Sequence, residues 1–486
     1  MGGFYDFGPL GTLLKNKIIQ LWRKYYVLGE GFFEIDSPTI MPEEVLKASG
    51  HVDHFLDAMT QCQKCGAAFR VVDILREAVG KDIEGLPKVE MERLLREQGV
   101  RCPDCGGELG PIFDFNMMFQ TTIGPGAQRV GYLRPETAQG IFIDFKRLQR
   151  YARGRLPFGV VQIGKGYRNE ISPRQGIIRL REFTMAEAEV FFDPQKPNHP
   201  RFSEVAGEKL RLLSADAQKA GKGELLEVTA ERASNDKLVC NELMAYYLAL
   251  TKLFLIDLGI PEGAIRFRQQ TPGERAHYSS ETWDAEVLTE RFGWVEVAGL
   301  AYRTDYDLTR HAKFSGEDLS MFSADAGRKV VCHVIEPSYG IDRPLYCVLE
   351  HTFVQEKDRA YLRLRKGLAP IEAGVFPLLN RDGLPEKAWE VYQSLRRKGL
   401  MVEYDDSGSI GRRYARADEI GTPYCITIDH QTLKDDTVTI RDRDTTSQIR
   451  VKIEILPATL RSLLSDEVGF RKAGEIFYKG PEKSRT

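Results

Sequence analysis

Charged residues are concentrated at positions 167–192, in a segment that otherwise has the composition of β-strands. A turn-forming stretch, SPRQG at 172–176, separates two runs suited to an extended chain, which predicts a hairpin. In the first run, Arg168 and Glu170 are expected to share a face. In the second run, one face carries Arg179, Arg181, Phe183, Met185 and Glu187. The other face, expected in the core, carries Ile178, Leu180, Thr184, Ala186 and Ala188.

The charged face of this hairpin combines groups that suit a nucleotide. Guanidinium groups bind phosphate oxygens through paired hydrogen bonds, and an aromatic ring stacks on a purine. A carboxylate at Glu187 would then bind a cationic group beside the nucleotide. A solvated salt-bridge ladder on two antiparallel strands has the same pattern, so the hairpin alone does not separate the two interpretations.

The common phosphate-binding loops are missing from the sequence. It contains neither a GxxxxGK[ST] loop nor a GxGxxG stretch after a strand. Phosphates would therefore be held by side chains, and the candidates are Arg168, Arg179 and Arg343.

Four of the eight cysteines form two CxxC knuckles, Cys62 with Cys65 and Cys102 with Cys105. Four thiolates at this spacing are typical of a structural zinc site, and reduced, unliganded thiols are the alternative. Two amphipathic helices are expected between the knuckles. The remaining cysteines are expected to be small core residues: Cys240, Cys332, Cys347 and Cys425. A structural role is also expected for the two histidines of SGHVDHF, His51 and His54.

Helices and strands that position these residues can be read along the chain. An apolar stripe at helical spacing predicts a helix through Leu14, Ile18, Leu21, Trp22 and Tyr25. Strands are expected at 31–42 and 294–308, and Pro135 followed by Glu136 is a favourable helix start. Residues 330–353 read as a strand, a glycine turn and a helix beginning near Arg343. The last 120 or so residues alternate helix and strand, which predicts a separate α/β unit.

Length and composition indicate a globular protein. The 486 residues suggest about three domains. The apolar runs are short and interrupted by charge, so no membrane span is expected. The N-terminus lacks the pattern of a secretory signal, which favours the cytoplasm. The formal net charge is −2, so nucleic-acid binding would depend on local basic patches at 358–367, 396–399 and 411–416, each of which is also typical of a solvated helix face.

In combination, the motifs resemble those of the class II aminoacyl-tRNA synthetases. Tyr167-Arg168-Asn169-Glu170, followed by Arg179 and Phe183, resembles motif 2; GIDR ending at Arg343 resembles motif 3, and GFFEIDSPTI resembles motif 1. YDFGPLG, SGHVDHF, LRPETAQGIF and VIEPSYGIDR are similar to stretches of the homodimeric, archaeal and eukaryotic type of glycyl-tRNA synthetase. IGRRYARADEIGTPYCITID resembles a class IIa anticodon-binding domain. One departure is that Met1 directly precedes Gly2, where this family usually has a further segment.

The resemblance implies an α+β protein: an antiparallel-sheet catalytic domain with zinc-type and helical insertions, and a C-terminal α/β anticodon-binding domain. The implied catalytic core has three parts, namely 1–60 with motif 1 and the dimer interface, 111–193 with motif 2, and 277–366 with motif 3. Residues 61–110 would be the zinc-knuckle insertion and 194–276 a polar, helical insertion that contacts the tRNA acceptor stem. Residues 367–486 would bind the anticodon.

The activity implied by the resemblance is ATP-dependent attachment of glycine to its tRNA through a glycyl-adenylate, with Mg²⁺ accompanying ATP and structural Zn²⁺. Arg168 and Arg343 would be catalytic, and Arg303 would lie near the reaction centre. The implied ATP-binding residues are Arg168, Asn169, Glu170, Arg179, Leu180, Phe183, Glu296, Val297 and Arg343. The implied glycine-binding residues are Glu136, Glu187, Glu336 and Ser338. The implied metal ligands are Cys62, Cys65, Cys102 and Cys105. The implied partners are ATP, glycine, tRNA(Gly) and a second copy of the chain, with no membrane.

Three other interpretations use the same motifs. A non-catalytic polymerase accessory subunit of this fold would lack the arginines of the hairpin and motif 3, which are present. A zinc-dependent nucleic-acid-binding module leaves Glu136, Glu187 and Glu336 unexplained. An adenylating enzyme with a different acceptor would not need the C-terminal α/β unit.

Overall fold

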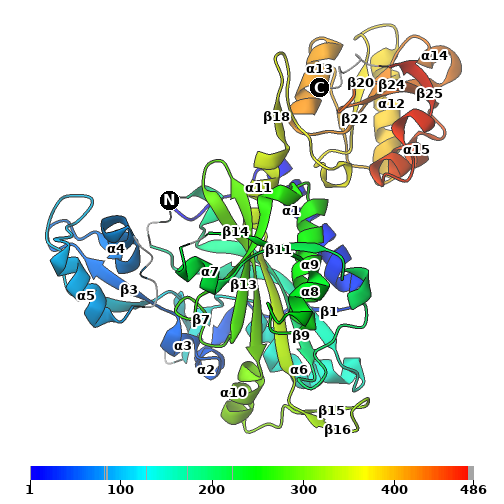
Figure 1. The fold of residues 1–486 in the computed structure, drawn as a ribbon. Helices are drawn as coiled ribbons and strands as arrows, with labels where there is room; N and C mark the ends of the chain where they lie inside the picture. Colours follow the sequence, from blue (N-terminus) through cyan, green and yellow to red (C-terminus); the bar gives the residue numbers. More distant parts are fainter. Residues whose placement is uncertain are drawn as a thin grey trace. The chain divides into compact units, whose positions relative to one another are not determined.

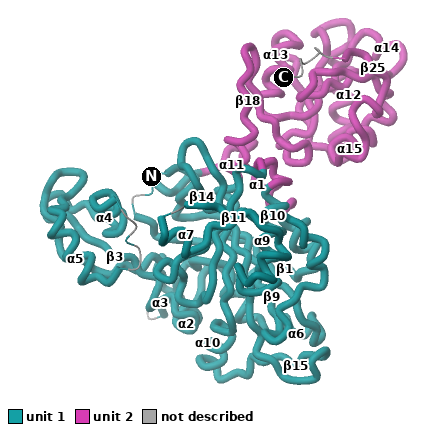
Figure 2. The backbone as a smooth tube through the Cα atoms, viewed as in Figure 1, with its two compact units in different colours: residues 1–5, 22–255, 262–344 teal, residues 6–21, 256–261, 345–486 magenta. Residues whose placement is uncertain are grey.

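The computed structural model describes residues 2–80, 83, 86–126, 129–171, 173, 175–221 and 223–479. Two residues of the predicted hairpin turn, Ser172 and Arg174, lie outside the described residues. The chain divides into two compact units (Figure 2). Unit 1 comprises residues 1–5, 22–255 and 262–344, and unit 2 comprises 6–21, 256–261 and 345–486. Among the described residues, no helix has both the length and the apolar character needed to cross a membrane.

Unit 1 is built on a nine-stranded sheet with the order β1-β8-β9-β17-β14-β13-β12-β10-β11 (Figure 1). Neighbouring strands are antiparallel except for the pairs β1 with β8 and β10 with β12, which confirms the predicted antiparallel sheet. The strands are β1 (Phe33–Ile35), β8 (Phe158–Tyr167), β9 (Glu182–Phe192), β17 (His333–Gly340), β14 (Gly293–Thr304), β13 (Glu281–Thr289), β12 (Ile265–Gln269), β10 (Lys209–Leu213) and β11 (Leu226–Thr229).

Helices cover both faces of this sheet, and the central strand β9 is accordingly buried at every position from Thr184 to Phe192. On one face, Tyr339 of β17 packs against Trp22 and against Phe254 of α9 (Glu242–Asp257). On the other face, α6 (Ala138–Ala152) contributes Phe142 and Phe145, which pack against Phe191 of β9. Since alternate residues of a strand point to opposite faces, Glu187 of β9 and Ser338 of β17 lie on the α6 side.

The hairpin of β8 and β9 is shorter than predicted. Their pairing runs from Phe158 opposite Phe191 to Tyr167 opposite Glu182. Arg168 and Glu170 therefore lie beyond β8, and residues 179–181 form a loop before β9. The expectation that Arg181 shares the binding face is wrong, because its guanidinium instead binds the carbonyl oxygens of Glu170 and Gly2 at 2.8 Å each.

The segment 194–276 differs from the predicted polar, helical insertion. It contains α7 (Ala215–Lys219), α8 (Ala230–Asn235) and α9, but β10, β11 and β12 extend the central sheet. The α9 helix is apolar on nearly every side because it is buried. The helix predicted from Pro135 begins instead at Ala138, because Thr137 is its N-cap residue.

Residues 56–116 form a small subdomain of unit 1, in which two helices pack together beside a three-stranded sheet. The two predicted amphipathic helices are confirmed as α4 (Val71–Val79) and α5 (Lys88–Glu97). Their apolar faces form a core around Leu75 and Met91. The adjoining sheet has the order β4-β3-β5, with β4 (Ala68–Arg70), β3 (Leu56–Gln61) and β5 (Phe113–Asn116).

The other elements of unit 1 are shorter. A second three-stranded sheet contains β2 (Ile40–Pro42), β7 (Arg129–Leu133) and β6 (Gln120–Ile123). Unit 1 also contains η1 (Lys24–Gly29), α2 (Glu43–Ala48), α3 (His51–His54), η2 (Gly176–Ile178), η3 (Phe202–Glu204), η4 (Glu262–Ala264), α10 (Tyr306–Ser315), β15 (Met321–Ser323) and β16 (Arg328–Val330). The predicted sequence of strand, turn and helix at 330–353 is confirmed by β17 and α11 (Asp342–Thr352), a helix that belongs to unit 2 from Leu345 on.

Unit 2 contains the predicted C-terminal α/β fold. Its six-stranded sheet has the order β21-β20-β22-β23-β24-β25 around a buried apolar core. These strands are β21 (Val402–Tyr404), β20 (Ala373–Pro377), β22 (Tyr424–Ile428), β23 (Thr437–Asp442), β24 (Gln448–Lys452) and β25 (Glu475–Tyr478). The helices are α12 (Leu384–Arg397), α13 (Ile410–Glu419), α14 (Thr432–Asp435) and α15 (Leu456–Leu464). Unit 2 also takes in residues 6–21, most of the predicted N-terminal helix, which is confirmed as α1 (Pro9–Arg23).

Candidate active site

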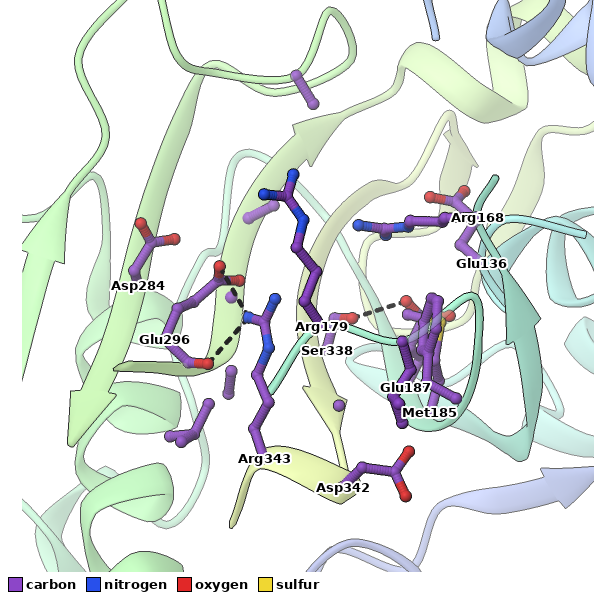
Figure 3. A pocket seen from close by; sticks show the side chains of 18 of the residues that line it. Glu136, Arg168, Arg179, Met185, Glu187, Asp284, Glu296, Ser338, Asp342 and Arg343 are labelled. Carbon is purple, nitrogen blue, oxygen red and sulfur yellow. Dashed lines mark hydrogen bonds and ion pairs between the residues drawn. The ribbon is translucent and has the colours of Figure 1, made fainter. Parts of the chain in front are cut away.

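A cavity of about 240 Å³ opens on the α6 side of the central sheet in unit 1 (Figure 3). Twelve of the residues implied for ATP and glycine line it: Glu136, Arg168, Glu170, Arg179, Leu180, Phe183, Glu187, Glu296, Val297, Glu336, Ser338 and Arg343. They come from β9, β14, β17, the start of α11, the segment between β8 and β9 and the loop between β7 and α6. Folding therefore gathers residues that lie more than 200 positions apart in the sequence.

Asn169 is the implied ATP-binding residue that is not among those lining the cavity. Its backbone N–H donates to the carbonyl oxygen of Met117 at 2.7 Å. This bond fixes the chain between Arg168 and Glu170, which both line the cavity.

At one side of the cavity, Arg343 is held by three hydrogen bonds, of which those to Glu296 are drawn in Figure 3. Its Nε donates to the carbonyl oxygen of Ile178 at 3.0 Å, and its Nη1 donates to both the carbonyl and the carboxylate of Glu296 at 2.9 and 3.0 Å. A guanidinium held in this way keeps its plane fixed and can present its remaining donors to an anion without reordering.

Two more arginines line the cavity near an aromatic plate. The guanidinium carbon of Arg168 lies 5.4 Å from the Phe183 ring centroid and 5.5 Å from that of Phe55. Arg179 donates through Nε to Oε2 of Glu170 at 2.7 Å. Three guanidinium groups and one aromatic ring in a single cavity match the phosphates and the base of a nucleotide.

The floor of the cavity contains a carboxylate fixed by three donors. Oε1 of Glu187 accepts from the Ser338 hydroxyl at 2.6 Å, and Oε2 accepts from the backbone N–H of Thr137 at 2.5 Å and from its hydroxyl. Thr137 is the N-cap of α6, so Glu187 also lies at the positive end of that helix. The carboxylate is 1% exposed and has a defined orientation.

Arg303 organises the other carboxylates beneath the cavity. It is fully buried and donates to Asp307 at 2.7 and 3.0 Å, to Glu336 at 2.8 Å and to Glu136 at 3.4 Å. His51 lies 3.4 Å from the other oxygen of Glu136. Arg303, which was expected near the reaction centre, thus contacts two of the glutamates that line the cavity.

The two glutamates bound to Arg303 have opposite pKa shifts. Burial, opposed by Arg303, raises the pKa of Glu336 to about 8. Burial also acts to raise the pKa of Glu136, but His51 and Arg303 outweigh it and hold that pKa well below its usual range. The carboxyl groups around Arg303 outnumber the cationic groups, so a small cation bound in the cavity would reduce the repulsion between the carboxylates.

Several cavity-lining residues were not predicted from the sequence. Tyr278, Gln270, Asp284 and Asp342 line the cavity. Asp342 directly precedes Arg343 in the motif 3 stretch, and its carboxylate accepts the backbone N–H of Thr184 at 2.7 Å. Asp342 could have been predicted from its place beside Arg343 in that motif. Tyr278 lies in a loop that matches no motif, so its position could not be inferred from the sequence. The deeper Glu189 was also missed; it is fully buried, and neither carboxylate oxygen has a hydrogen-bond partner among the described residues.

The four knuckle cysteines lie together. Their Sγ atoms are all within 4.8 Å of one another, with 3.5 Å between Cys62 and Cys105 and 3.6 Å between Cys65 and Cys102. Tetrahedral zinc with Zn–S bonds of about 2.3 Å places its sulfurs about 3.8 Å apart, so the cluster fits zinc. Of the remaining cysteines, Cys332, Cys347 and Cys425 are buried as expected, but Cys240 is exposed, so its assignment to the core is wrong.

Comparisons with known proteins agree with this geometry. A family model described as tRNA synthetase class II core domain (G, H, P, S and T) matches residues 125–214, and one described as anticodon binding domain matches residues 372–463. The chain is similar in fold to a solved structure, Giardia lamblia prolyl-tRNA synthetase in complex with prolyl-adenylate, with a TM-score of 0.55 and 16% identity over 94% of this chain and 70% of that one.

Curated relatives match over almost the whole chain. The glycine–tRNA ligase of Pyrococcus horikoshii is 49% identical, over 95% of this chain and 94% of the relative. That of Methanothermobacter thermautotrophicus is 48% identical over 95% of each, and that of Methanocaldococcus jannaschii is 46% identical over 96% and 95%. The chain belongs to the glycine–tRNA ligase family of class II aminoacyl-tRNA synthetases.

Proposed function

We propose that this chain attaches glycine to tRNA(Gly) in two steps, both at the cavity of unit 1 described above. The observation that carries the proposal is that three arginines and three buried glutamates, Glu136, Glu187 and Glu336, line the same 240 Å³. The arginine side suits a polyphosphate and the glutamate side suits a small ammonium group. The family membership agrees with both.

In the first step, a carboxylate oxygen of glycine attacks the α-phosphorus of ATP and pyrophosphate leaves, which gives glycyl-adenylate. Arg168 and Arg343 would bind the phosphates, with Arg343 toward the γ-phosphate and Arg179 assisting. Phe183 would stack on the adenine, while Glu170, Leu180 and the backbone near Asn169 bind around the ring. The rate enhancement would come from positioning and charge stabilisation, because no protein nucleophile is required.

In the second step, a terminal hydroxyl of the tRNA attacks the carbonyl carbon of glycyl-adenylate and AMP leaves. Glu187, with Glu136, Glu336 and Ser338, would hold the glycine ammonium group throughout both steps. The hydrogen bonds from Ser338 and Thr137 fix the Glu187 carboxylate, so it need not reorganise when the substrate binds.

Two metal ions fit residues of this chain. Glu296, with Val297 beside it, would act near ATP and Mg²⁺; its side chain is 47% exposed and only Oε2 is bound by Arg343, which suits a partly hydrated hard cation. When bound, Mg²⁺ supplies neutralisation of the phosphate charge. The four knuckle cysteines would hold a structural Zn²⁺ that fastens α4 and α5 to the β3 sheet.

The domain roles extend the proposal beyond the cavity. We assign residues 1–60, 111–193 and 277–366 to the catalytic core, 61–110 to the zinc-knuckle insertion, 194–276 to contact with the acceptor stem and 367–486 to anticodon binding. Motif 1, in the first of these segments, would form the interface of a homodimer. The reaction would take place in the cytoplasm, where its substrates are available.

Exchange of pyrophosphate with ATP tests the first step. Each amino acid is supplied in turn to the wild type, to Glu187→Gln and to Arg343→Ala. We expect exchange with glycine and a loss of at least about tenfold in both variants, since each removes a charged hydrogen-bond partner that contributes about 1.5–3 kcal/mol. A folded wild-type protein that gives no exchange with any amino acid would contradict the proposal and would favour the accessory-subunit interpretation.

A further inference from the structure

One wall of the cavity is an aromatic ring that the synthetase motifs do not include. Tyr278 lies in the loop between β12 and β13 and lines the cavity together with Glu136 and Glu336. The inference drawn from this wall rests on the proposed function. It concerns how the site binds glycine and excludes an amino acid that has a side chain.

The ring lies between the cavity and the buried arginine. Its centroid is 3.7 Å from the guanidinium carbon of Arg303, which itself binds Glu336 at 2.8 Å and Glu136 at 3.4 Å. Arg303 is fully buried and is not among the residues lining the cavity, whereas Tyr278 is. The ring therefore covers Arg303 on the side where the carboxylates would receive an ammonium group.

The ring cannot swing aside easily because the chain is anchored on both sides of it. His277 bonds through Nε2 to the carbonyl oxygen of Ser49 at 3.0 Å, and the N–H of Ser280 donates to the carbonyl of Tyr302 at 2.9 Å. The stack on Arg303 adds a third contact, worth more than an exposed one because it is desolvated. A fixed wall is what the rejection of a single methyl group requires, since a mobile one would make room for it.

We propose that the Tyr278 ring is the steric determinant of amino-acid specificity. It occupies the space beside the glycine-binding carboxylates that a side chain on the α-carbon would need. Glycine is accepted because it has no Cβ, and alanine is refused because its methyl group meets the ring. The carboxylates then supply affinity and Tyr278 supplies exclusion.

The test measures ATP–pyrophosphate exchange with glycine and with alanine on the wild type, Tyr278→Ala, Tyr278→Leu and Tyr278→Phe. In Tyr278→Ala the ratio of kcat/KM for glycine over alanine falls by about tenfold or more, since one methyl group in a pocket is worth about 10–200-fold. The ratio also falls in Tyr278→Leu. In Tyr278→Phe the ratio stays at the wild-type value because the ring remains. Leu180→Ala, which enlarges the cavity beside the nucleotide, is the matched control: it weakens ATP binding but leaves the ratio unchanged.

Three results would overturn the proposal. One is a Tyr278→Ala enzyme that exchanges glycine with an unchanged ratio, and another is a Tyr278→Phe enzyme as relaxed as Tyr278→Ala, which would assign the effect to the hydroxyl group. The third is loss of exchange with both amino acids in folded Tyr278→Ala and Tyr278→Leu, which would make the ring a support for Arg303 instead of a wall. Absence of glycine exchange in the wild type would instead refute the proposed function itself, so the two failures are distinguishable.

Discussion

At the scale of single residues, the glutamates of the cavity have different partners and therefore different properties. Glu187 is bound by neutral donors from Thr137 and Ser338, whereas Glu336 shares the buried guanidinium of Arg303 with Glu136 and Asp307. Neutral donors orient a carboxylate without cancelling its charge, so Glu187 is the member best suited to bind an ammonium group.

The hydroxyl of Ser338 supports this role of Glu187 and can be removed without changing any charge. We expect Ser338→Ala to raise the KM for glycine about threefold to tenfold, because one hydrogen bond contributes about 0.5–1.5 kcal/mol. Pyrophosphate exchange at varied glycine concentration measures it. Ser465→Ala, at an exposed helix end in unit 2, serves as the control. An unchanged KM would show that the position of Glu187 does not depend on this bond.

Burial of Glu336 makes stability depend on pH. Its pKa is raised to about 8, so the folded protein keeps this proton up to about pH 8, whereas an unfolded chain releases it near pH 4.3. The free energy of unfolding therefore falls as pH rises between these two values and then levels off. We expect Glu336→Gln to abolish the part of this pH dependence that comes from Glu336. Between pH 5 and pH 9 the Tm of the variant should therefore fall less than the Tm of the wild type.

The matched control for this experiment is Glu454→Gln, at an exposed position of unit 2. It should follow the wild-type profile. If Glu336→Gln also retained the full wild-type loss of Tm, the pH dependence would belong to other buried groups, of which Glu189 is the first candidate because burial raises its pKa well above the usual range.

At the scale of elements, the segment between and around the CxxC knuckles has too small an apolar core to account for its stability. The α4 and α5 helices are only 9 and 10 residues long and share a small apolar cluster. Isolated helices of this length are marginal in water, so this subdomain needs another constraint, and a bound metal would provide it.

Loss of the metal should therefore unfold this subdomain and leave the nine-stranded sheet intact. We expect Cys102→Ser to lower the bound zinc from about one equivalent to near zero and to increase amide hydrogen exchange in α4 and α5 but not in β9 or β17. Cys240→Ser, at an exposed cysteine outside the cluster, should keep its zinc. Full protection of α4 and α5 in zinc-free Cys102→Ser would contradict a structural role for the metal.

At the scale of the whole molecule, the two compact units divide the work that the proposed reaction requires. The cavity is lined entirely by residues of unit 1, whereas the match to an anticodon-binding domain lies in unit 2. Variants in unit 2 should therefore separate the tRNA-dependent step from adenylate formation.

The basic patch at 411–416 provides such a variant, because its arginines differ in burial. Arg413 is buried and binds the carbonyl oxygens of Pro377, Asp406 and Gly408, so it supports the fold, whereas Arg412 is exposed. We expect Arg412→Glu to lower kcat/KM for tRNA about tenfold at 0.1 M salt, because it replaces an attractive charge with a repulsive one near phosphates. Pyrophosphate exchange without tRNA should stay at the wild-type rate.

Lys434→Glu, an equal change of charge at an exposed position of α14, is the control for Arg412→Glu. Aminoacylation should be reduced much less by this change. Equal effects of the two variants would mean that only the net charge of unit 2 matters and that α13 does not contact the tRNA.

Elements whose signals are local could be predicted from the amino-acid sequence alone. The CxxC knuckles, the paired helices between them, the hairpin and the strand, turn and helix around Arg343 all follow from short-range spacing. The structure brings the four cysteines together and contains the helices and the strand, turn and helix as predicted, whereas the hairpin is shorter than predicted. The sequence also supplied twelve residues of the cavity, through motifs whose members are few positions apart.

Features that depend on residues far apart in the sequence could be seen only in the folded chain. The polar composition of 194–276 did not reveal that β10, β11 and β12 extend the central sheet, since strand pairing is set by partners elsewhere in the chain. Arg181 leaves the cavity because Glu170 and Gly2 offer it carbonyl oxygens. Arg303 organises the carboxylates because folding brings three acidic side chains, Asp307, Glu336 and Glu136, around one buried guanidinium. Local sequence fixes which groups are present, but burial and pairing with residues far along the chain fix what those groups do.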